Sequence, residues 1–511
     1  MRKTIIKSFS KYYYLCISFV VILCYGFTLT NFSMGIDDEA FKAYFENNSL
    51  LYQGRWGYVI LKRIFNSYEF LPLWRDLIAI CLIVAGLTMF NFILKTYTNN
   101  LWNNTLSIIF TCISISFPYI ASMFVFMMTT IETGMVYLLV SFSLHFYFCW
   151  HFKKKHWINL IYSIGTLTFA ISFSETSPVI FLLIFFITCF LRTLITNEES
   201  KLTKVLLSIL KIFILIFISI VFWEIVKIIL QKILNVPNSS YVNNYITYNF
   251  SGVVPFLNSL KHFIVTQFNT IIAGFKLDYA TKTVSLSIFV TLISIIFLAI
   301  KNKKISIFIY GICILISAFA LSIVTGNPSL PHRALTCLSF LVSFAFCLLY
   351  IIFRNISIKK FKFKYIVLFL VIVNIFYQSK QMNRTFFIDY KGYQYDITMA
   401  SQIYHDLKAV TDNNKVIFVG TPPDFNQVVE PSVGNSLFVW DRHELLQLEL
   451  RSTRLYEFFK QHGYDIYPTE YDIGNLKTQI NGMPNWPKTG SIKDCKDYTI
   501  IKLGKSFLEK C

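Results

Sequence analysis

Three consecutive acids, Asp37, Asp38 and Glu39, follow the first strongly apolar stretch of the chain. A carboxylate at a membrane surface can take the proton from an acceptor hydroxyl group while a new bond forms, which makes Asp37 and Asp38 candidate general bases. Acids are also favourable in the first turn of a helix because they complement its dipole, and "AFKAYFENN" is predicted to be helical. The two roles are compatible, since one acid can stabilise the helix while another reacts.

The short element "QGRWG", residues 53–57, comes next. Arg55 can bind a phosphate through the two parallel donors of its guanidinium group, and Trp56 can stack on a sugar ring. His332 and Arg333, which precede a later apolar block, are further candidates for contact with a lipid phosphate. For these side chains the alternative is structural, because Arg extends to lipid head groups and aromatic rings gather at the membrane interface.

Three glutamates, Glu39, Glu132 and Glu175, complete the candidate substrate-binding groups. Glu132 opens one apolar block, and Glu175 lies between two of them in "SFSETSPV". Ionisable groups at such depth are costly and often functional, although capping of a helix end is the alternative. Glu224 and Lys227, three positions apart in one apolar block, are predicted to form a structural ion pair.

The sequence contains no motif of the common soluble enzymes. It has no Gly-rich phosphate loop, no zinc-ligand spacing and no serine nucleophile elbow. No cofactor and no metal ion is indicated, although a divalent metal is compatible with the acids. The chemistry is therefore expected to depend on ionisable groups at the membrane surface.

The elements that must position these groups are apolar. Of the 511 residues, 55% are hydrophobic and only 15% are charged, whereas soluble globular chains carry about 25% charged residues. Most apolar blocks approach the ~20 residues that a helix needs to cross a bilayer. The sequence thus predicts an all-α polytopic membrane protein with about eleven transmembrane helices, the first retained because no cleavage site follows it. The blocks are Tyr12 to Leu29, Leu77 to Leu94, Leu106 to Phe117, Ile131 to Trp150, Ile158 to Phe173, Val179 to Ile195, Val205 to Leu230, Val284 to Ile300, Ile305 to Val324, Leu335 to Phe353 and Tyr365 to Tyr377.

Basic residues indicate the orientation, because they are concentrated in cytoplasmic loops. All clusters fall on one side if the N-terminus is cytoplasmic and the spans alternate, and the candidate site residues then lie outside. The same distribution explains much of the net charge of +19. It also argues against nucleic-acid binding, since the basic residues form no single patch. The clusters are Arg2, Lys3, Lys7 and Lys11; Lys153, Lys154 and Lys155; Lys301, Lys303 and Lys304; and Arg354, Lys359, Lys360, Lys362 and Lys364.

Two domains are predicted. Residues 1–377 form a multispan membrane domain with a first outside loop at 31–75. A second outside loop at 231–282 has a broken apolar stretch that is predicted to lie as one or two helices in the interface. Residues 378–511 are more polar and are predicted to form a small extracytoplasmic α/β domain, in which "KVIFVG" and "YTIIKL" are strands and "RHELLQLELRSTRLYEFFKQHG" is a helix.

Cysteine usage differs between these regions. Nine of the eleven cysteines lie in or beside apolar blocks, where Cys behaves as a small apolar residue. Cys495 and Cys511 are the only two in the polar C-terminal region. Either they form a disulfide, which an oxidising compartment permits, or Cys511 is free at the end of the chain.

The segment "DDEAFKAYFENNSLLYQGRWG", the apolar block before it, the multispan body and the polar C-terminal region together resemble the serotype-converting glucosyltransferases that modify bacterial O-antigen, part of lipopolysaccharide. More broadly they are similar to the membrane C-type glycosyltransferase fold. The resemblance implies transfer of a sugar, expected to be glucose, from a polyprenyl-phosphate donor such as undecaprenyl phosphate glucose to a polysaccharide acceptor at the periplasmic face of the inner membrane. It also implies a donor-synthesising glycosyltransferase and a donor flippase as partners. The family's first-loop acid would then be Asp37 or Asp38.

The number of catalytic groups bears on the mechanism of transfer, and two other functions are alternatives to it. Transfer by a single displacement inverts the anomeric carbon and needs one base, whereas retention needs two well-placed groups, so inversion is favoured. A flippase or transporter of lipid-linked glycan is one alternative, but transporters tend to have internal repeats and charged groups at the mid-plane, neither of which is visible here. An O-antigen polymerase is the other alternative, and its distinctive loop usually lies in the middle of the chain.

Overall fold

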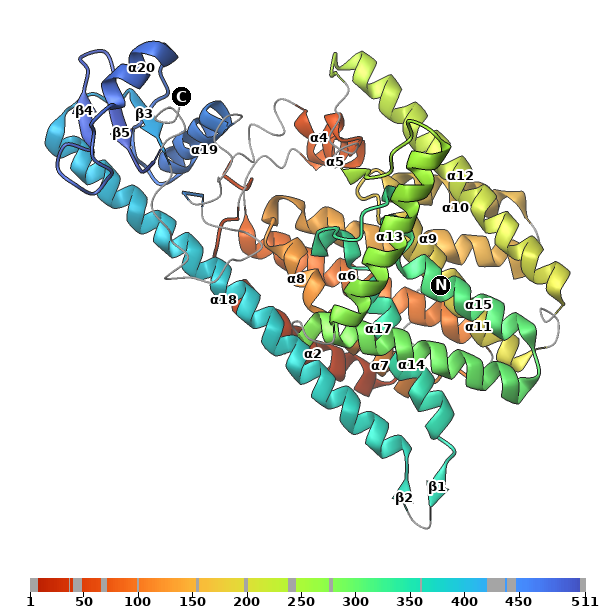
Figure 1. Ribbon diagram of the computed structural model, residues 1–511. Helices are drawn as coiled ribbons and strands as arrows, with labels where there is room; N and C mark the ends of the chain where they lie inside the picture. Colours follow the sequence, from red (N-terminus) through yellow and green to blue (C-terminus); the bar gives the residue numbers. More distant parts are fainter. Residues whose placement is uncertain are drawn as a thin grey trace. The chain divides into compact units, whose positions relative to one another are not determined.

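The computed structural model describes residues 8–35, 37–39, 48–65, 71–98, 101–152, 156–196, 201–237, 245–274, 279–358, 361–420, 437–438 and 447–505. The chain is mostly helical and divides into two compact units (Figure 1). Unit 1 comprises Met1–Gly26, Asn47–Met123 and Thr129–Asn383, and unit 2 comprises Phe27–Glu46, Phe124–Met128 and Arg384–Cys511.

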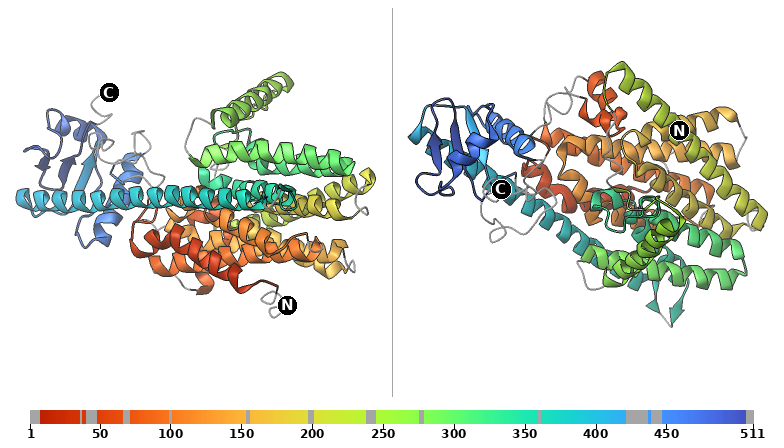
Figure 2. Two further views of the ribbon diagram at one scale, coloured as in Figure 1. Left: turned by 90° about the horizontal axis from the view of Figure 1, so that it is seen from below. Right: turned by 45° about the horizontal axis from the view of Figure 1, so that its top comes forward.

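Unit 1 is a bundle of apolar helices that lie side by side (Figure 2). Its α-helices in the described residues are α2 (Lys11–Thr30), α4 (Ser49–Tyr52), α5 (Trp56–Phe65), α6 (Pro72–Tyr97), α7 (Asn104–Ile115), α8 (Pro118–Phe124), α9 (Thr130–Phe152), α10 (Trp157–Ile171), α11 (Ser177–Ile195), α12 (Leu202–Ile233), α13 (Val253–Ala273), α14 (Tyr279–Asn302), α15 (Ile305–Ala318), α16 (Ala320–Thr325), α17 (Leu338–Phe353) and the first part of α18 (Lys364–Val410). α6 packs along α9, α9 along α10 and α11 along α15, while α17 contacts both α7 and α14. Continuous apolar runs form helices here because a helix satisfies its backbone hydrogen bonds internally.

The predicted apolar blocks all coincide with helices, so the prediction of a multispan helical protein is confirmed in outline. Within the described residues, seven helices are long and apolar enough to cross a membrane, or eight if the bent pair α7 and α8 is one span. That pair bends by 51°, and Pro118 explains the break because it cannot continue the hydrogen-bond ladder of α7. α10, α15 and α17 are apolar but shorter, so the number of eleven spans stays a prediction.

Two hydrogen bonds join helix ends that alternation of the predicted spans would place on one side of the membrane. The amine of Lys304, between α14 and α15, donates to the carbonyl of Thr193 at the end of α11 at 2.8 Å. The guanidinium group of Arg354, after α17, donates to the carbonyl of Leu101, before α7, at 3.3 Å. Both contacts join helix ends that the basic clusters assign to the same side. Lys153 to Lys155, Lys359 and Lys360 lie outside the described residues.

The orientation itself can be tested with a fusion. A reporter enzyme that is active only outside the cytoplasm, fused after Lys391 in α18, should be active, because an odd number of alternating spans brings this part of the chain outside. Reporter activity in whole cells, normalised to the amount of fusion protein, is the measurement. Activity of a cytoplasm-specific reporter at the same position would contradict the predicted orientation.

The outside loop predicted at 231–282 contains one long helix in its described part, α13. This agrees with the prediction of one or two helices there. α13 exposes an apolar set that includes Val253, Leu257, Ile264 and Phe268, and it buries Phe263. Exposed apolar side chains over several turns are typical of a helix lying against lipid, and an interfacial position of α13 stays a prediction.

Unit 2 contains a three-stranded sheet in the order β3 (Val416–Val419), β5 (Thr499–Lys502), β4 (Ile492–Asp494). β3 is parallel to β5, and β4 is antiparallel to β5. One face of the sheet packs against α18 and α19 (Gln447–Gln461), and the other packs against α20 (Ile473–Ile480). Both predicted strands and the predicted helix are therefore confirmed. A domain boundary between residues 377 and 378 stays a prediction.

β3 shows why the sequence folds this way. Val416 and Phe418 point into the core that includes Ile403 and Phe459, whereas Ile417 and Val419 point into the core on the opposite face. Successive side chains of a strand alternate between its faces, so an unbroken apolar run such as "VIFV" is expected where both faces are covered.

Candidate active site

Asp38 holds the first loop to the segment Phe124–Met128 within unit 2. Its carboxylate accepts hydrogen bonds from the backbone N–H groups of Gly35 at 3.0 Å, Met127 at 3.2 Å and Met128 at 2.8 Å. The side chain is buried, and this burial raises the pKa of the Asp38 carboxyl to about 7, while the three N–H groups lower it. Both carboxylate oxygens thus accept backbone hydrogen bonds, which suits a structural anchor.

The close approach of these two segments depends on Gly35. A Cβ atom at this position would lie 2.2 Å from the carbonyl oxygen of Val125. No side chain can be accommodated at that separation without moving the backbone, so Gly35 is needed for Asp38 to reach Met127 and Met128.

Asp37 differs from Asp38 in its exposure and in its partner. Its side chain is 34% exposed, and Oδ1 forms an ion pair with Nη2 of Arg454 from α19. The backbone of Asp37 has a φ of 86°, a left-handed conformation that Asp tolerates better than most residues. The first loop therefore offers one partly exposed carboxylate, fixed beside a buried one.

Glu39 is buried against the same arginine. Its Oε1 lies 3.5 Å from Nη1 of Arg454, and its backbone carbonyl accepts a hydrogen bond from the side chain of Gln461, also on α19. Burial raises the pKa of the Glu39 carboxyl to about 8, although the charge of Arg454 lowers it. Asp37 and Glu39 thus share one guanidinium group.

Arg454 was not predicted as a site residue, because it lies far in the sequence from the apolar blocks beside which Arg55 and Arg333 are found. A signal does exist in the sequence, since Arg454 lies four residues before Phe458 and so falls in line with the apolar stripe of α19. Arg454 is only 8% exposed. A charged side chain on the buried stripe of a helix generally has a charged partner.

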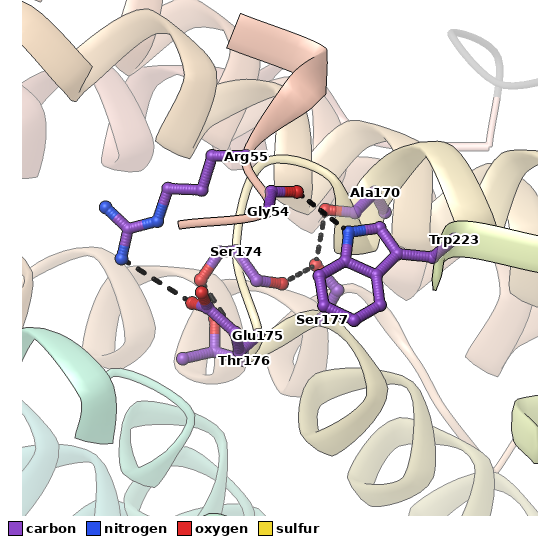
Figure 3. A network of polar contacts seen from close by, with 8 residues as sticks. All are labelled: Gly54, Arg55, Ala170, Ser174, Glu175, Thr176, Ser177 and Trp223. Atoms are coloured by element: carbon purple, nitrogen blue, oxygen red, sulfur yellow. Dashed lines mark hydrogen bonds and ion pairs between the residues drawn. The ribbon is translucent and has the colours of Figure 1, made fainter. Parts of the chain in front are cut away.

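In unit 1, Arg55 meets Glu175. Nη2 of Arg55 lies 3.6 Å from Oε2 of Glu175 (Figure 3). Both side chains are partly exposed. Hydroxyl groups hold the loop that carries Glu175. Ser174 Oγ and Thr176 Oγ1 are 2.8 Å apart. Ser177 Oγ donates to the carbonyls of Ala170 and Ser174. The pair is therefore a partly exposed contact on a rigid loop.

Gly57 brings these two segments together. Its N–H donates to the carbonyl of Ser172 at 3.3 Å, and a Cβ atom here would lie only 2.2 Å from Ser172 Oγ. Trp56 is buried beside it, with its ring 5.8 Å from that of Phe169 and its indole N–H donating to the carbonyl of Trp223. In this conformation the Trp56 ring packs against other parts of the bundle and anchors the start of α5 (Trp56–Phe65).

Glu132 lies in a buried cluster of charges at the start of α9. Its Oε1 is 3.3 Å from the amine of Lys62 on α5, and its Oε2 is 3.2 Å from the guanidinium group of Arg75 on α6. All three side chains are at most 4% exposed. Burial lowers the pKa of Lys62 to about 8, and Glu132 opposes this shift.

Tyr58 and Lys62, four residues apart, lie on one face of α5, and Arg55 immediately precedes this helix. Burial raises the pKa of the Tyr58 phenol above its usual range, with Glu132 and Glu175 adding to the shift and Arg55 opposing it. This face of α5 thus runs from the Glu175 contact to the Glu132 cluster.

His332 and Arg333 lie in the short helix η4 (His332–Leu335). The exposed imidazole of His332 stacks on the ring of Tyr119, with centroids 4.1 Å apart and an angle of 7° between the planes. Arg333 is half-buried. This stacking holds His332 in place in the segment just before α17.

Much of the chain matches the model of a known protein family. The family model described as glucosyl transferase GtrII matches residues 26–375. The chain belongs to the GtrII family. A search of the curated proteins and a search of the solved structures each found no match.

Membership of the GtrII family confirms the resemblance and makes the chain a membrane glucosyltransferase. The matched region contains the first-loop acids, Arg55, Glu132 and Glu175. It ends before Arg454, so the GtrII match includes the acids but not the arginine that contacts them.

The remaining predictions for this GtrII chain concern an ion pair, a disulfide and metal binding. Glu224 and Lys227 form the predicted ion pair at 2.8 Å. Cys495 is partly buried and Cys511 lies outside the described residues, so the disulfide between them stays a prediction. Among the described residues, no group of three or more His, Cys, Asp or Glu side chains is arranged to hold a metal ion.

Proposed function

We propose that this GtrII-family chain transfers glucose from a polyprenyl-phosphate donor to O-antigen or a related surface polysaccharide. The reaction would take place at the periplasmic face of the bacterial inner membrane, in an inverting single displacement. The acceptor oxygen bonds to the anomeric carbon while the bond from that carbon to the phosphate oxygen breaks. The electron pair stays on the phosphate, and the acceptor proton passes to a carboxylate.

The observation that carries this proposal is the contrast between Asp37 and Asp38. A general base must reach the acceptor hydroxyl, and Asp37 is 34% exposed, whereas Asp38 is 1% exposed and accepts three backbone hydrogen bonds. We therefore assign the base to Asp37 and the anchoring of the loop to Asp38. Arg454 orients the Asp37 carboxylate through their ion pair and does not itself accept the proton.

The donor phosphate needs cations near the membrane surface. A polyprenyl phosphate cannot leave the bilayer, so its leaving group must be met at the ends of the spans. We assign this role to Arg55, whose partly exposed guanidinium group is held by Glu175, and to the half-buried Arg333. A guanidinium group binds phosphate through two parallel hydrogen bonds. The donor would be supplied by a donor-synthesising glycosyltransferase and a flippase.

Reconstitution tests the proposed function directly. Purified protein in lipid vesicles should move label from polyprenyl-phosphate glucose to a lipid-linked polysaccharide, and the anomeric configuration of the product, measured by NMR, should be inverted. Cells with and without the gene should differ by a glucose branch on the polysaccharide. Movement of the intact donor across the vesicle membrane without transfer would indicate a flippase, and a change in polysaccharide chain length would indicate a polymerase.

A further inference from the structure

We infer that Arg454 is a positioning residue for the first-loop acids and that α19, near the C-terminus, is thereby part of the catalytic unit. This inference rests on the proposed role of Asp37 as the base. It extends the site beyond residues 26–375, the region that matches the GtrII family.

The contact is built from two places on α19. Arg454 lies beside two carboxylates, with Nη2 at Asp37 Oδ1 and Nη1 at 3.5 Å from Glu39 Oε1. Gln461, two helical turns later on the same face, donates to the backbone carbonyl of Glu39. Arg454 thus holds the two carboxylates, and Gln461 holds the backbone of the loop. Both contacts come from one helix.

α19 itself is firmly placed within unit 2. Leu455, Phe458 and Phe459 are at most 2% exposed and pack in the core with β3 and α18. Arg454 adjoins this packed stripe, so its guanidinium group has little freedom to move. A rigid support of this kind keeps a reacting group within the narrow range of positions that catalysis requires.

The backbone of Asp37 explains why support is needed. A residue other than glycine with a φ of 86° is retained only where its surroundings determine the conformation. Asp38 fixes the loop on one side through its three backbone hydrogen bonds. Arg454 fixes the Asp37 side chain on the other, so removal of Arg454 should leave the loop attached but the carboxylate misplaced.

Loss of Arg454 need not unfold unit 2. Glu39 would lose its cation, but its carboxyl can bind a proton, since burial already raises its pKa to about 8. A neutral Glu39 removes the cost of a buried unpaired charge. An Arg454 variant can therefore be folded and still impaired.

The test uses the full-length protein in vesicles with polyprenyl-phosphate glucose and acceptor. Arg454→Ala should lower kcat by about 10²-fold, because a displacement of about 1 Å is enough for such a loss, while KM for the donor changes little. Methylguanidinium ion, added at millimolar concentration, should restore part of kcat by occupying the space of the lost side chain. Arg454→Lys should retain intermediate activity. Lys460→Ala, on an exposed position of the same helix, is the matched control and should equal the unmodified protein.

Two results would overturn the inference. One is an Arg454→Ala protein with normal kcat. The other is a loss that methylguanidinium does not restore and that is accompanied by a lower melting temperature, which would make Arg454 a purely structural residue. Failure of the proposed function is distinguishable, because the unmodified protein would then show no glucose transfer, or Asp37→Asn would be fully active.

Discussion

Replacing Asp37 with Asn should lower turnover by roughly 10²–10⁴-fold, the usual contribution of a general base. Asn preserves the size of the side chain and tolerates the left-handed backbone at this position, so the protein should still insert and fold. The measurement is kcat for glucose transfer at equal amounts of membrane-inserted protein, with KM for the donor determined in parallel. Near-normal kcat would remove Asp37 from the reaction and leave the partly exposed Glu175 as the next candidate.

Asp38→Asn is the informative comparison for this variant, because it should act on stability instead. Asn is an excellent replacement for Asp at an ordinary helix N-cap, but Asp38 accepts N–H groups on both oxygens. The amide nitrogen of Asn would face at least one of these donors, at a cost of about 1–3 kcal/mol. The variant should melt at a lower temperature, and its folded fraction should keep most of its kcat.

The largest effect on stability is expected for Glu132→Gln. This change leaves Lys62 and Arg75 buried without the carboxylate they share, and breaking a buried ion pair typically costs about 3–5 kcal/mol. The free energy of unfolding in a mild detergent, or the melting temperature, is the measurement. Glu175→Gln is the matched control, since its ion pair with Arg55 is partly exposed and should contribute no more than about 1 kcal/mol.

The Glu132→Gln deficit should also depend on pH in a definite direction. Burial lowers the pKa of Lys62 to about 8 in the folded protein, and Glu132 opposes that shift, so the variant should have a still lower value. In either protein, between the folded-state pKa of Lys62 and the ordinary value near 10.4, the folded state binds fewer protons than the unfolded state, and stability rises with pH. The unmodified protein gains stability from Lys62 only above about pH 8, whereas the variant gains it from its lower pKa upward, so the deficit should shrink as the pH rises towards 8 and stay constant above it. A deficit independent of pH, or no deficit at all, would contradict the proposed role of the buried cluster.

The helices and the individual acids were predictable because their signals are local. An apolar run such as that of α6 specifies a helix without reference to the rest of the chain, and "SFSETSPV" draws attention to Glu175 by the rarity of a charge between apolar blocks. The strand β3 was predictable for the same reason, since a short apolar run ended by Gly420 is a local pattern.

The partners of these acids were not predictable, because they are remote in sequence. Glu132 meets Arg75 across 57 positions, and Gln461 meets Glu39 across 422. Asp37 and Asp38 could not be distinguished either. Asp38 is buried because it accepts hydrogen bonds from the backbone N–H groups of Met127 and Met128. Every residue except proline has such a group, so the sequence does not mark these two positions. Trp56 is a similar case, since its packing against Phe169 depends on how α5 meets α10.

α10 has a consequence for the lipid around the protein. With 15 residues it is about 22 Å long, whereas the hydrocarbon core of a bilayer is about 30 Å thick. Its surface is apolar and exposed at Trp157, Ile161 and Tyr162. If α10 spans the bilayer, as the sequence predicts, lipid must adapt to it, since a short apolar helix is accommodated by local thinning of the bilayer. The polar loop that follows α10 would then lie in a depression of the membrane surface, level with the head group of a phosphate-bearing lipid. Acyl-chain length would in this way become a determinant of how readily a lipid-bound sugar reaches the protein.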